Sequence, residues 1–262
     1  MGLLQNVFKQ KLVLSFISVM VFLLVWDLGV ITHLFGSYLP RPIDVIKALI
    51  NLAVEPLSGK VLYEHIWFST KRVLIGYGIA LLIGIPIGVL MAGNLYARAI
   101  ISPIFDLIKP MPPIAFISMA ILWFGIGEGS KIFIIVIGAF VPLVINTFNG
   151  IRIVDEELYD VIRTLGGSRR DEIIQVMFPA SFPAIFAGMQ ISLSLAFSCV
   201  LAAELVGARE GLGFIIVMGM KLSNTAIIIG GMVMIGIIAW GISVGIKYTE
   251  RWVCPWKEDL KA

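Results

Sequence analysis

Long apolar segments that carry almost no charge recur along this chain, and they constrain its fold more than any other feature. Six such segments can be marked out, each of roughly the 20 residues that an α-helix needs to cross a bilayer. Composition agrees, because 59% of the residues are hydrophobic and only 14% are charged. A soluble domain of this size does not need so much apolar surface. The sequence therefore predicts an all-α integral membrane protein with about six transmembrane helices.

The predicted spans make up a single membrane domain, residues 1–262. They lie at about 12–34, 66–97, 99–124, 132–149, 184–206 and 222–246. The first is expected to be retained rather than cleaved, because no small-residue cleavage site follows it. After this span, a short amphipathic helix is expected, with four apolar residues on one face: Ile43, Ile46, Leu49 and Ile50.

The distribution of Lys and Arg favours one orientation in the membrane. With six spans, both termini share a side with the loop at about 150–183, which carries four arginines: Arg152, Arg163, Arg169 and Arg170. Since cytoplasmic loops are enriched in basic residues, we expect this loop and both termini in the cytoplasm. The net charge of +3 is too small to suggest a nucleic-acid partner.

The loop at 150–183 is an island of charge between two apolar spans, and its first half has the pattern of a helix. Asp155 is a plausible N-cap, and Glu156 and Glu157 suit the positive end of a helix. An apolar stripe follows at helical spacing: Leu158, Val161, Ile162 and Leu165. The opposite face carries charges at pairing distance: Glu156, Asp160 and Arg163.

The second half of the loop predicts another short helix. Gly166 and Gly167 supply a stop for the first helix, because a left-handed backbone is easy there. Ser168 and Asp171 resemble a capping box that starts the second helix, and Pro179 is expected to close it. Such a pair of helices is typical either of a docking surface for an aqueous partner or of an amphipathic element lying on lipid headgroups.

Prolines interrupt the third predicted span early in its course, at Pro110, Pro112 and Pro113. Lipid cannot satisfy the carbonyl groups that prolines free, so a broken helix there must face protein or a water-filled cavity. A lining of a pathway and a packed kink are both compatible with this pattern. Glycine pairs, Gly84 with Gly88 and Gly241 with Gly245, indicate close helix packing.

Glu204 is the one ionisable residue of the fifth predicted span. Ionisable residues within membrane helices are candidates for a pathway or gate by default. Its place near the end of the span also allows an interfacial carboxylate that pairs with a base, with Arg209 as the nearest candidate. No metal site is expected, because no cluster of His, Cys, Asp or Glu has metal-ligand spacing. The two cysteines, Cys199 and Cys254, imply no disulfide framework.

The charged loop resembles the "EAA" loop of permease subunits of ATP-binding-cassette (ABC) importers. Asp160, Val161 and Ile162 stand at the triplet, Gly166 at the glycine and Pro179 at the downstream proline. Acidity is kept at Asp160, whereas Val and Ile replace the small alanines of the motif. Further stretches are similar to the nitrate/sulfonate/taurine/bicarbonate permease group: LPRP, STKRVLIGYGIAL, AILWFGIGEGSKIF, INTFNGIR and LAAELVGAREGLGFII.

This resemblance implies a type I ABC importer (MetI-like) permease fold in a prokaryotic inner membrane. It implies as partners a second copy of the chain, two cytoplasmic ATPase subunits that bind ATP and Mg, and an external solute-binding protein. The absence of a GxxxxGK[ST] motif agrees, since the chain has no phosphate-binding loop of that kind. The implied function is passage of a small anion of the sulfonate, taurine, nitrate or bicarbonate type, with no catalytic residue in this chain. A thiamine precursor or another small organic molecule is the alternative.

The resemblance also assigns roles to residues. Contact with the ATPase is expected of the loop residues Glu156, Glu157, Asp160, Arg163, Leu165, Gly166, Ser168 and Pro179. A secondary transporter is the less favoured class, because it would need buried ionisable relays or paired broken helices in two repeats, and the sequence shows neither.

Overall fold

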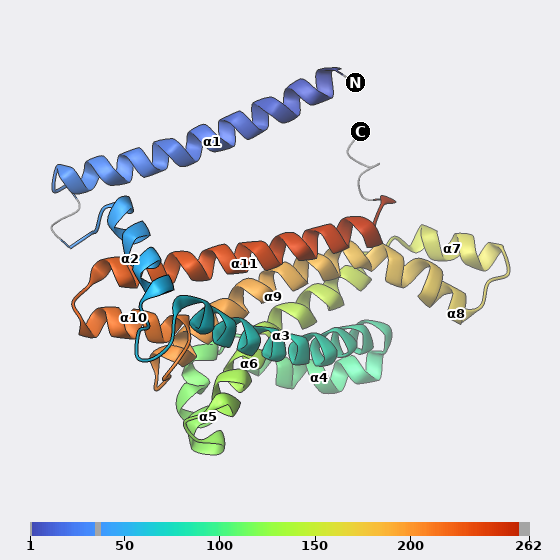
Figure 1. Ribbon diagram of the computed structural model, residues 1–262. Helices are drawn as coiled ribbons and strands as arrows, with labels where there is room; N and C mark the ends of the chain where they lie inside the picture. Colours follow the sequence, from blue (N-terminus) through green and yellow to red (C-terminus); the bar gives the residue numbers. More distant parts are fainter. Residues whose placement is uncertain (1, 35–37, 257–262) are drawn as a thin grey trace. The chain divides into compact units, whose positions relative to one another are not determined.

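The computed structural model describes residues 2–34 and 38–256, and these fold almost entirely into helices joined by short turns (Figure 1). The elements are α1 (Gly2–Ile31), α2 (Pro42–Val54), α3 (Leu62–Gly93), α4 (Leu95–Ile108), η1 (Pro113–Phe116), α5 (Ile117–Phe124), α6 (Glu128–Arg152), α7 (Glu156–Thr164), α8 (Arg169–Asp171), η2 (Glu172–Met177), α9 (Phe178–Leu205), α10 (Leu212–Lys221) and α11 (Thr225–Val253). The predicted all-α class is confirmed.

Five helices of the described chain are long and apolar enough to cross a bilayer. They are Val13–Ile31, Leu62–Gly93, Glu128–Arg152, Arg169–Leu205 and Thr225–Val253. A sixth candidate is the pair formed by α4 and η1–α5, which is bent by 87°. The expectation of about six spans is therefore met, with one of them broken.

The helices differ from the prediction in some of their boundaries and in one additional helix. The second span ends at Gly93 rather than near residue 97, because the Asn94 side chain accepts hydrogen bonds from the backbone N–H groups of Tyr96 (2.9 Å) and Ala97 (3.1 Å) and so starts α4. A helix not expected from the sequence, α10, lies before the sixth span. Its ten residues rise only about 15 Å, which is too little to cross a membrane.

The prediction that Pro179 closes a short helix is wrong. The helix runs from Arg169 to Leu205 through α8, η2 and α9. Proline lacks the N–H of a regular helix and sits best in a first turn. Here Pro179 lies in the first turn of α9, directly after the π-helical η2, where the Phe178 N–H bonds to the Ile173 carbonyl. The wider π turn accommodates the proline without ending the helix.

The described chain divides into two compact units, which are treated separately below. One comprises the residues up to His65 together with Ile215–Val233, and the other comprises Ile66–Phe214 together with the residues from Met234 onward. In the larger unit, buried side chains of α3, α5, α6 and α9 form one apolar core, with the α11 residues Ile235, Ile238 and Ile242 packed against it.

Glycines allow α3 to approach α6 closely in this core. A Cβ atom on Gly84 would lie 3.1 Å from Leu143, and one on Gly88 would lie 2.6 Å from Thr147. The predicted packing role of this pair is confirmed. Gly241 and Gly245 differ, because a Cβ added to either meets no described atom within 4 Å.

The smaller unit contains α1, whose described side chains are mostly exposed, and α2. The end of α1 is tied to the start of α2 by a bidentate ion pair between Arg41 and Asp27, at 2.8 and 3.0 Å. The expected short helix is present, and its buried residues are Val45 and Leu52, whereas the isoleucines of the expected apolar face are exposed.

Candidate functional site

The loop between α6 and α9 is an ordered pair of helices, beginning with α7. Glu156 and Glu157 occupy its first turn, where the helix dipole favours negative charge. Asp155 stands at the predicted N-cap position, although its side chain makes no capping hydrogen bond.

The glycine stop after α7 is confirmed in atomic detail. Gly166 has φ +79°, in the left-handed region that favours glycine. The Gly167 N–H bonds to the Ile162 carbonyl at 2.9 Å, and the Gly166 N–H bonds to the Arg163 carbonyl at 3.0 Å. This pair of bonds is the Schellman motif, which satisfies the last carbonyls of the helix.

Ser168 restarts the helix as predicted. The Asp171 carboxylate accepts from the Ser168 N–H at 2.8 Å and from its hydroxyl at 2.6 Å, completing a capping box. Because this helix continues into α9, the loop is joined directly to the core of the larger unit.

A buried carboxylate holds α7 against the next helix. Arg163 donates from Nε to Glu172 Oε1 at 2.8 Å, whereas its contact with Asp160 on its own helix is longer, at 3.3 Å. The hydrogen bond to Glu172 raises the pKa of Arg163 above its usual value. Glu172 is 7% exposed and was missed from the sequence. A signal for it was present, since it lies three residues after Arg169, which it also approaches at 3.5 Å.

The apolar stripe of α7 faces outward. Leu158, Val161 and Leu165 are 46%, 56% and 78% exposed. Among the residues that the structure describes, none covers this stripe, while Ile162 is half-buried. This apolar stripe of α7 is therefore accessible for contact with another molecule.

The proline segment breaks the third span at the predicted place. Helix α4 ends at Ile108, Pro110 and Pro112 lie exposed in the turn, and Pro113 begins η1. Pro113 is half-buried and lies beside Gly138 of α6, where an added Cβ atom would be 3.6 Å from it. The break is therefore packed on one side and open on the other.

Glu204 lies at the far end of α9 from the loop, in a buried network. It is 1% exposed and accepts from the Ser69 hydroxyl (2.8 and 2.9 Å) and from the Gly213 N–H (2.8 Å). Its ionic partner is Arg72 of α3, at 2.8 Å. The suggested pairing with Arg209 is wrong, because Arg209 is exposed and Arg72 occupies the carboxylate.

Arg72 is the centre of this network, and all five of its N–H groups are used. Nε and Nη2 hold Glu128 in a bidentate pair at 2.7 Å, while Nη1 bonds to Glu204 and to the Glu210 carbonyl. Nη2 also reaches the Glu210 carboxylate at 3.3 Å. Glu128 takes a further cation, Lys131, at 3.2 Å. Two cations, Arg72 and Lys131, thus offset most of the charge of the three carboxylates, and each buried charge has a partner, as burial requires.

Sequence reasoning missed Arg72, Ser69 and Glu128 as members of this site. Arg72 and Glu204 are 132 residues apart, and only tertiary packing brings them together. The one available signal was Arg72 itself, a basic residue at the edge of an apolar span. Among the described residues, no cluster could hold a metal ion.

The fold defines a multi-pass membrane protein with an ordered helical loop between α6 and α9. The family model described as "Binding-protein-dependent transport system inner membrane component" matches residues 84–256, and the chain belongs to this family.

Curated relatives cover nearly the whole chain. The taurine transport system permease protein TauC of Escherichia coli is 32% identical over 97% of this chain and 93% of its own length. The putative aliphatic sulfonates transport permease protein SsuC of Bacillus subtilis is 30% identical over 96% and 89%. The nitrate import permease protein NrtB of Synechocystis is 30% identical over 96% and 93%.

Solved structures support the fold. An inward-facing structure of the MetNI methionine ABC transporter has a TM-score of 0.63 with 20% identity, covering 73% of this chain and 95% of that chain. The expected type I, MetI-like permease fold is therefore confirmed.

Proposed function

We propose that two copies of this chain form the translocation pathway of an ATP-driven importer of a small anion. The relatives are named for taurine, aliphatic sulfonates and nitrate, which share a compact oxyanion group. Both termini lie in the cytoplasm. An external binding protein delivers the solute, and two ATPase subunits bind ATP and Mg.

The outward apolar stripe of α7 carries this proposal. An exposed apolar stripe at helical spacing fits a groove on another protein, and α7 sits at the loop expected to face the ATPase. The acidic position of the triplet is occupied by Asp160, whose side chain is 70% exposed. Glu156, Glu157 and Ser168 lie on the same exposed loop.

The structure offers a path for transmitting movement from this loop. Arg163 fixes α7 to Glu172, and Glu172 belongs to the helix that continues through Pro179 to Leu205. Closure of the ATPase subunits on ATP would therefore displace α7 and α9 together, as a rigid-body gating step.

For the pathway itself, the two kinds of candidate residue differ in access. Pro110 and Pro112 are exposed at a break in the helix, with Pro113 packed behind them, and we assign this segment to the pathway. Glu204 is sealed by Arg72, Ser69 and Gly213, so we assign it to holding the α9–α10 connection closed rather than to contact with the solute.

The test is Leu165→Asp. Leu165 is 78% exposed, so the change leaves the interior of this chain intact while placing a charge in the proposed ATPase contact. We expect the ATPase subunit to co-purify poorly and ATP-driven uptake of taurine, sulfonates or nitrate to fall at least about tenfold, the effect of losing about 1.4 kcal/mol of contact.

Tyr96→Asp is the matched control, because Tyr96 is 84% exposed and lies in the first turn of α4, outside the loop. It should leave assembly and uptake unchanged. Normal assembly and uptake in the Leu165 variant would show that α7 is not the ATPase contact.

A further inference from the structure

Helix α2 has three distinct faces, and contacts among the described residues explain two of them. The first face is buried, with Val45 4% and Leu52 6% exposed. Leu49 packs against Gly230 of α11, since a Cβ atom added to Gly230 would lie 3.2 Å from the Leu49 side chain. This face fixes α2 to the rest of its unit.

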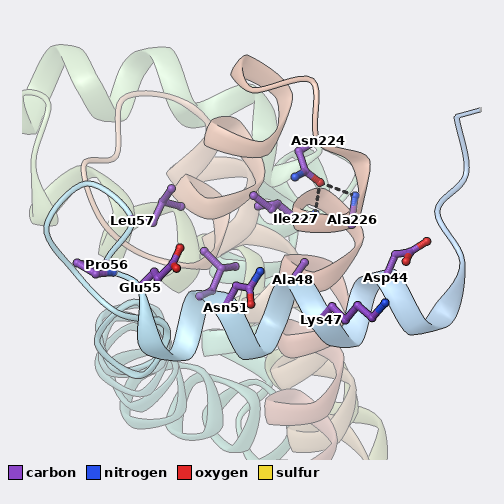
Figure 2. Close-up of a pocket in the computed structure, with 11 residues that line it drawn as sticks. Asp44, Lys47, Ala48, Asn51, Glu55, Pro56, Leu57, Asn224, Ala226 and Ile227 are labelled. Atoms are coloured by element: carbon purple, nitrogen blue, oxygen red, sulfur yellow. Dashed lines mark hydrogen bonds between the residues drawn. The ribbon is translucent and has the colours of Figure 1, made fainter.

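The second face is polar and borders a cavity of about 480 Å³ (Figure 2). It carries Asp44, Lys47, Asn51 and Glu55. Across the cavity, the Asn224 side chain accepts from the N–H groups of Ala226 and Ile227, at 3.1 and 3.3 Å, and so caps the start of α11. These charged and amide groups need water, so this face lies in an aqueous or headgroup environment.

The third face is an aliphatic stripe that runs the length of the helix, formed by Ile43, Ile46, Ile50 and Val54. Their spacing of three, four and four residues keeps them on one side. They are 46%, 53%, 58% and 74% exposed, although each is fully apolar. The aliphatic stripe therefore needs an apolar partner that the described residues do not supply.

The position of α2 indicates what this partner is. Its 13 residues rise only about 20 Å, too short to cross a bilayer, yet in the sequence it comes between the membrane helices α1 and α3. Its start is pinned to α1 by the Arg41–Asp27 pair and by the bond from Trp26 Nε1 to the Pro40 carbonyl, at 3.1 Å. It is thus held near the membrane boundary at this end of α1.

The side chains favour lipid over protein at this boundary. The stripe holds only Ile and Val, which acyl chains can solvate without any polar partner. Tyrosines flank the helix on both sides, with Tyr38 85% and Tyr63 69% exposed, and exposed tyrosines are typical of the headgroup level. An apolar face beside a charged one is the pattern of a helix lying in the interface plane.

We propose that α2 is an interfacial membrane helix. Its aliphatic stripe lies among the acyl chains of the leaflet at this end of α1, and its polar face and cavity open toward the aqueous side. The helix then anchors the connection between α1 and α3 to the bilayer surface. This inference concerns lipid contact and is independent of which solute is transported.

Spin labels on the full-length chain in bilayer nanodiscs test this. Single cysteines are introduced as Ile46→Cys and Ile50→Cys on the stripe and as Asn51→Cys and Glu55→Cys on the polar face. The native Cys199 and Cys254, both buried, are first replaced by alanine. Collision of each nitroxide with oxygen, which concentrates in lipid, is compared with collision with a water-soluble nickel chelate.

We expect oxygen to dominate at residues 46 and 50 and the nickel chelate to dominate at residues 51 and 55. Dominance of the nickel chelate at the stripe would place it in water and overturn the proposal. Immobile labels that neither reagent reaches would also overturn it, by showing a protein cover such as a second copy of the chain. Thermal unfolding of each labelled variant confirms that it is folded.

Discussion

At the scale of single residues, Arg72 is held by five hydrogen bonds. It is 1% exposed, and three carboxylates surround its guanidinium. Removing a charge from water costs several kcal/mol, and only excellent geometry offsets this. The five hydrogen bonds of Arg72 supply that geometry. They fasten α3 to α6 and to the connection that follows α9.

We expect Arg72→Met to destabilise the protein by about 3–5 kcal/mol, because it leaves the buried Glu204 carboxylate without its cation. Thermal unfolding in detergent measures the loss. The control is Lys109→Met, which breaks an exposed pair with Asp106 (3.1 Å) and should cost less than about 1 kcal/mol. In the double variant with Glu204→Gln, much of the loss should be recovered. Equal unfolding temperatures for the two single variants would contradict this account.

Gly166 allows a prediction that separates backbone strain from steric clash. An added Cβ atom meets nothing within 4 Å, so Gly166→Ala is opposed only by its φ of +79°, at a cost of about 1–2 kcal/mol. Weakening the Schellman end should loosen α7 and lower the coupling of ATP hydrolysis to uptake. Both rates are measured in proteoliposomes.

Gly59→Ala is the control for Gly166. Gly59 has φ +84° and equally open surroundings, but it lies in the turn between α2 and α3, outside the loop at 150–183. It should cost similar stability without uncoupling. Uncoupling by both variants, or by neither, would remove Gly166 from the coupling role.

At the scale of elements, contacts between helices depend on where each glycine lies rather than on its presence. On α3, Gly88 meets Thr147 of α6, whereas Gly78 meets no atom within 4 Å. The same distinction separates Gly84 and Gly88 from Gly241 and Gly245, which the sequence pattern placed in one class.

We expect Gly88→Ala to destabilise the protein by about 1–3 kcal/mol, because its Cβ atom would lie 2.6 Å from the Thr147 Cβ. Gly78→Ala on the same helix should instead be neutral or stabilise by up to about 1 kcal/mol, since alanine loses less backbone entropy. Unfolding temperatures of the two variants provide the comparison. A Gly88 variant as stable as the wild type would mean that α3 and α6 are less closely packed than described.

At the scale of the whole molecule, the exposed apolar surface is the main feature. The described part of α1 exposes large apolar residues on every side, among them Phe16, Phe22 and Leu28. A soluble monomer rarely exposes such a surface. In a bilayer this surface is solvated by lipid, so stability depends on packing and buried polar pairs within the bundle.

We expect the purified chain in nanodiscs to hydrolyse no ATP, and the complex with its ATPase subunits to hydrolyse ATP faster when the binding protein and its solute are added. The physical reason is that energy supply and solute capture belong to the partners proposed above. Phosphate release and the mass of the assembled complex provide the measurements. Hydrolysis by the chain alone, at a rate that survives removal of any contaminating ATPase, would contradict the assignment.

Many features of this protein depend only on short stretches of sequence and could therefore be predicted without the structure. The length of the apolar segments predicts the membrane spans, because an α-helix satisfies its own backbone groups and can therefore cross lipid. The stop at Gly166 and the cap at Ser168 follow from backbone rules that involve a few neighbouring residues, and the structure confirms both. The break at Pro112 follows in the same way.

Tertiary structure decided the rest, because those features depend on residues distant in sequence. The helix continues through Pro179 because the wider π-helical turn before it accommodates a residue that has no N–H group to donate. Glu204 is neutralised by Arg72, a partner 132 residues away. The isoleucines of α2 face outward since Val45 and Leu52 take the interior. Periodicity shows that a helix has an apolar face, but only packing selects which apolar face meets protein and which meets lipid.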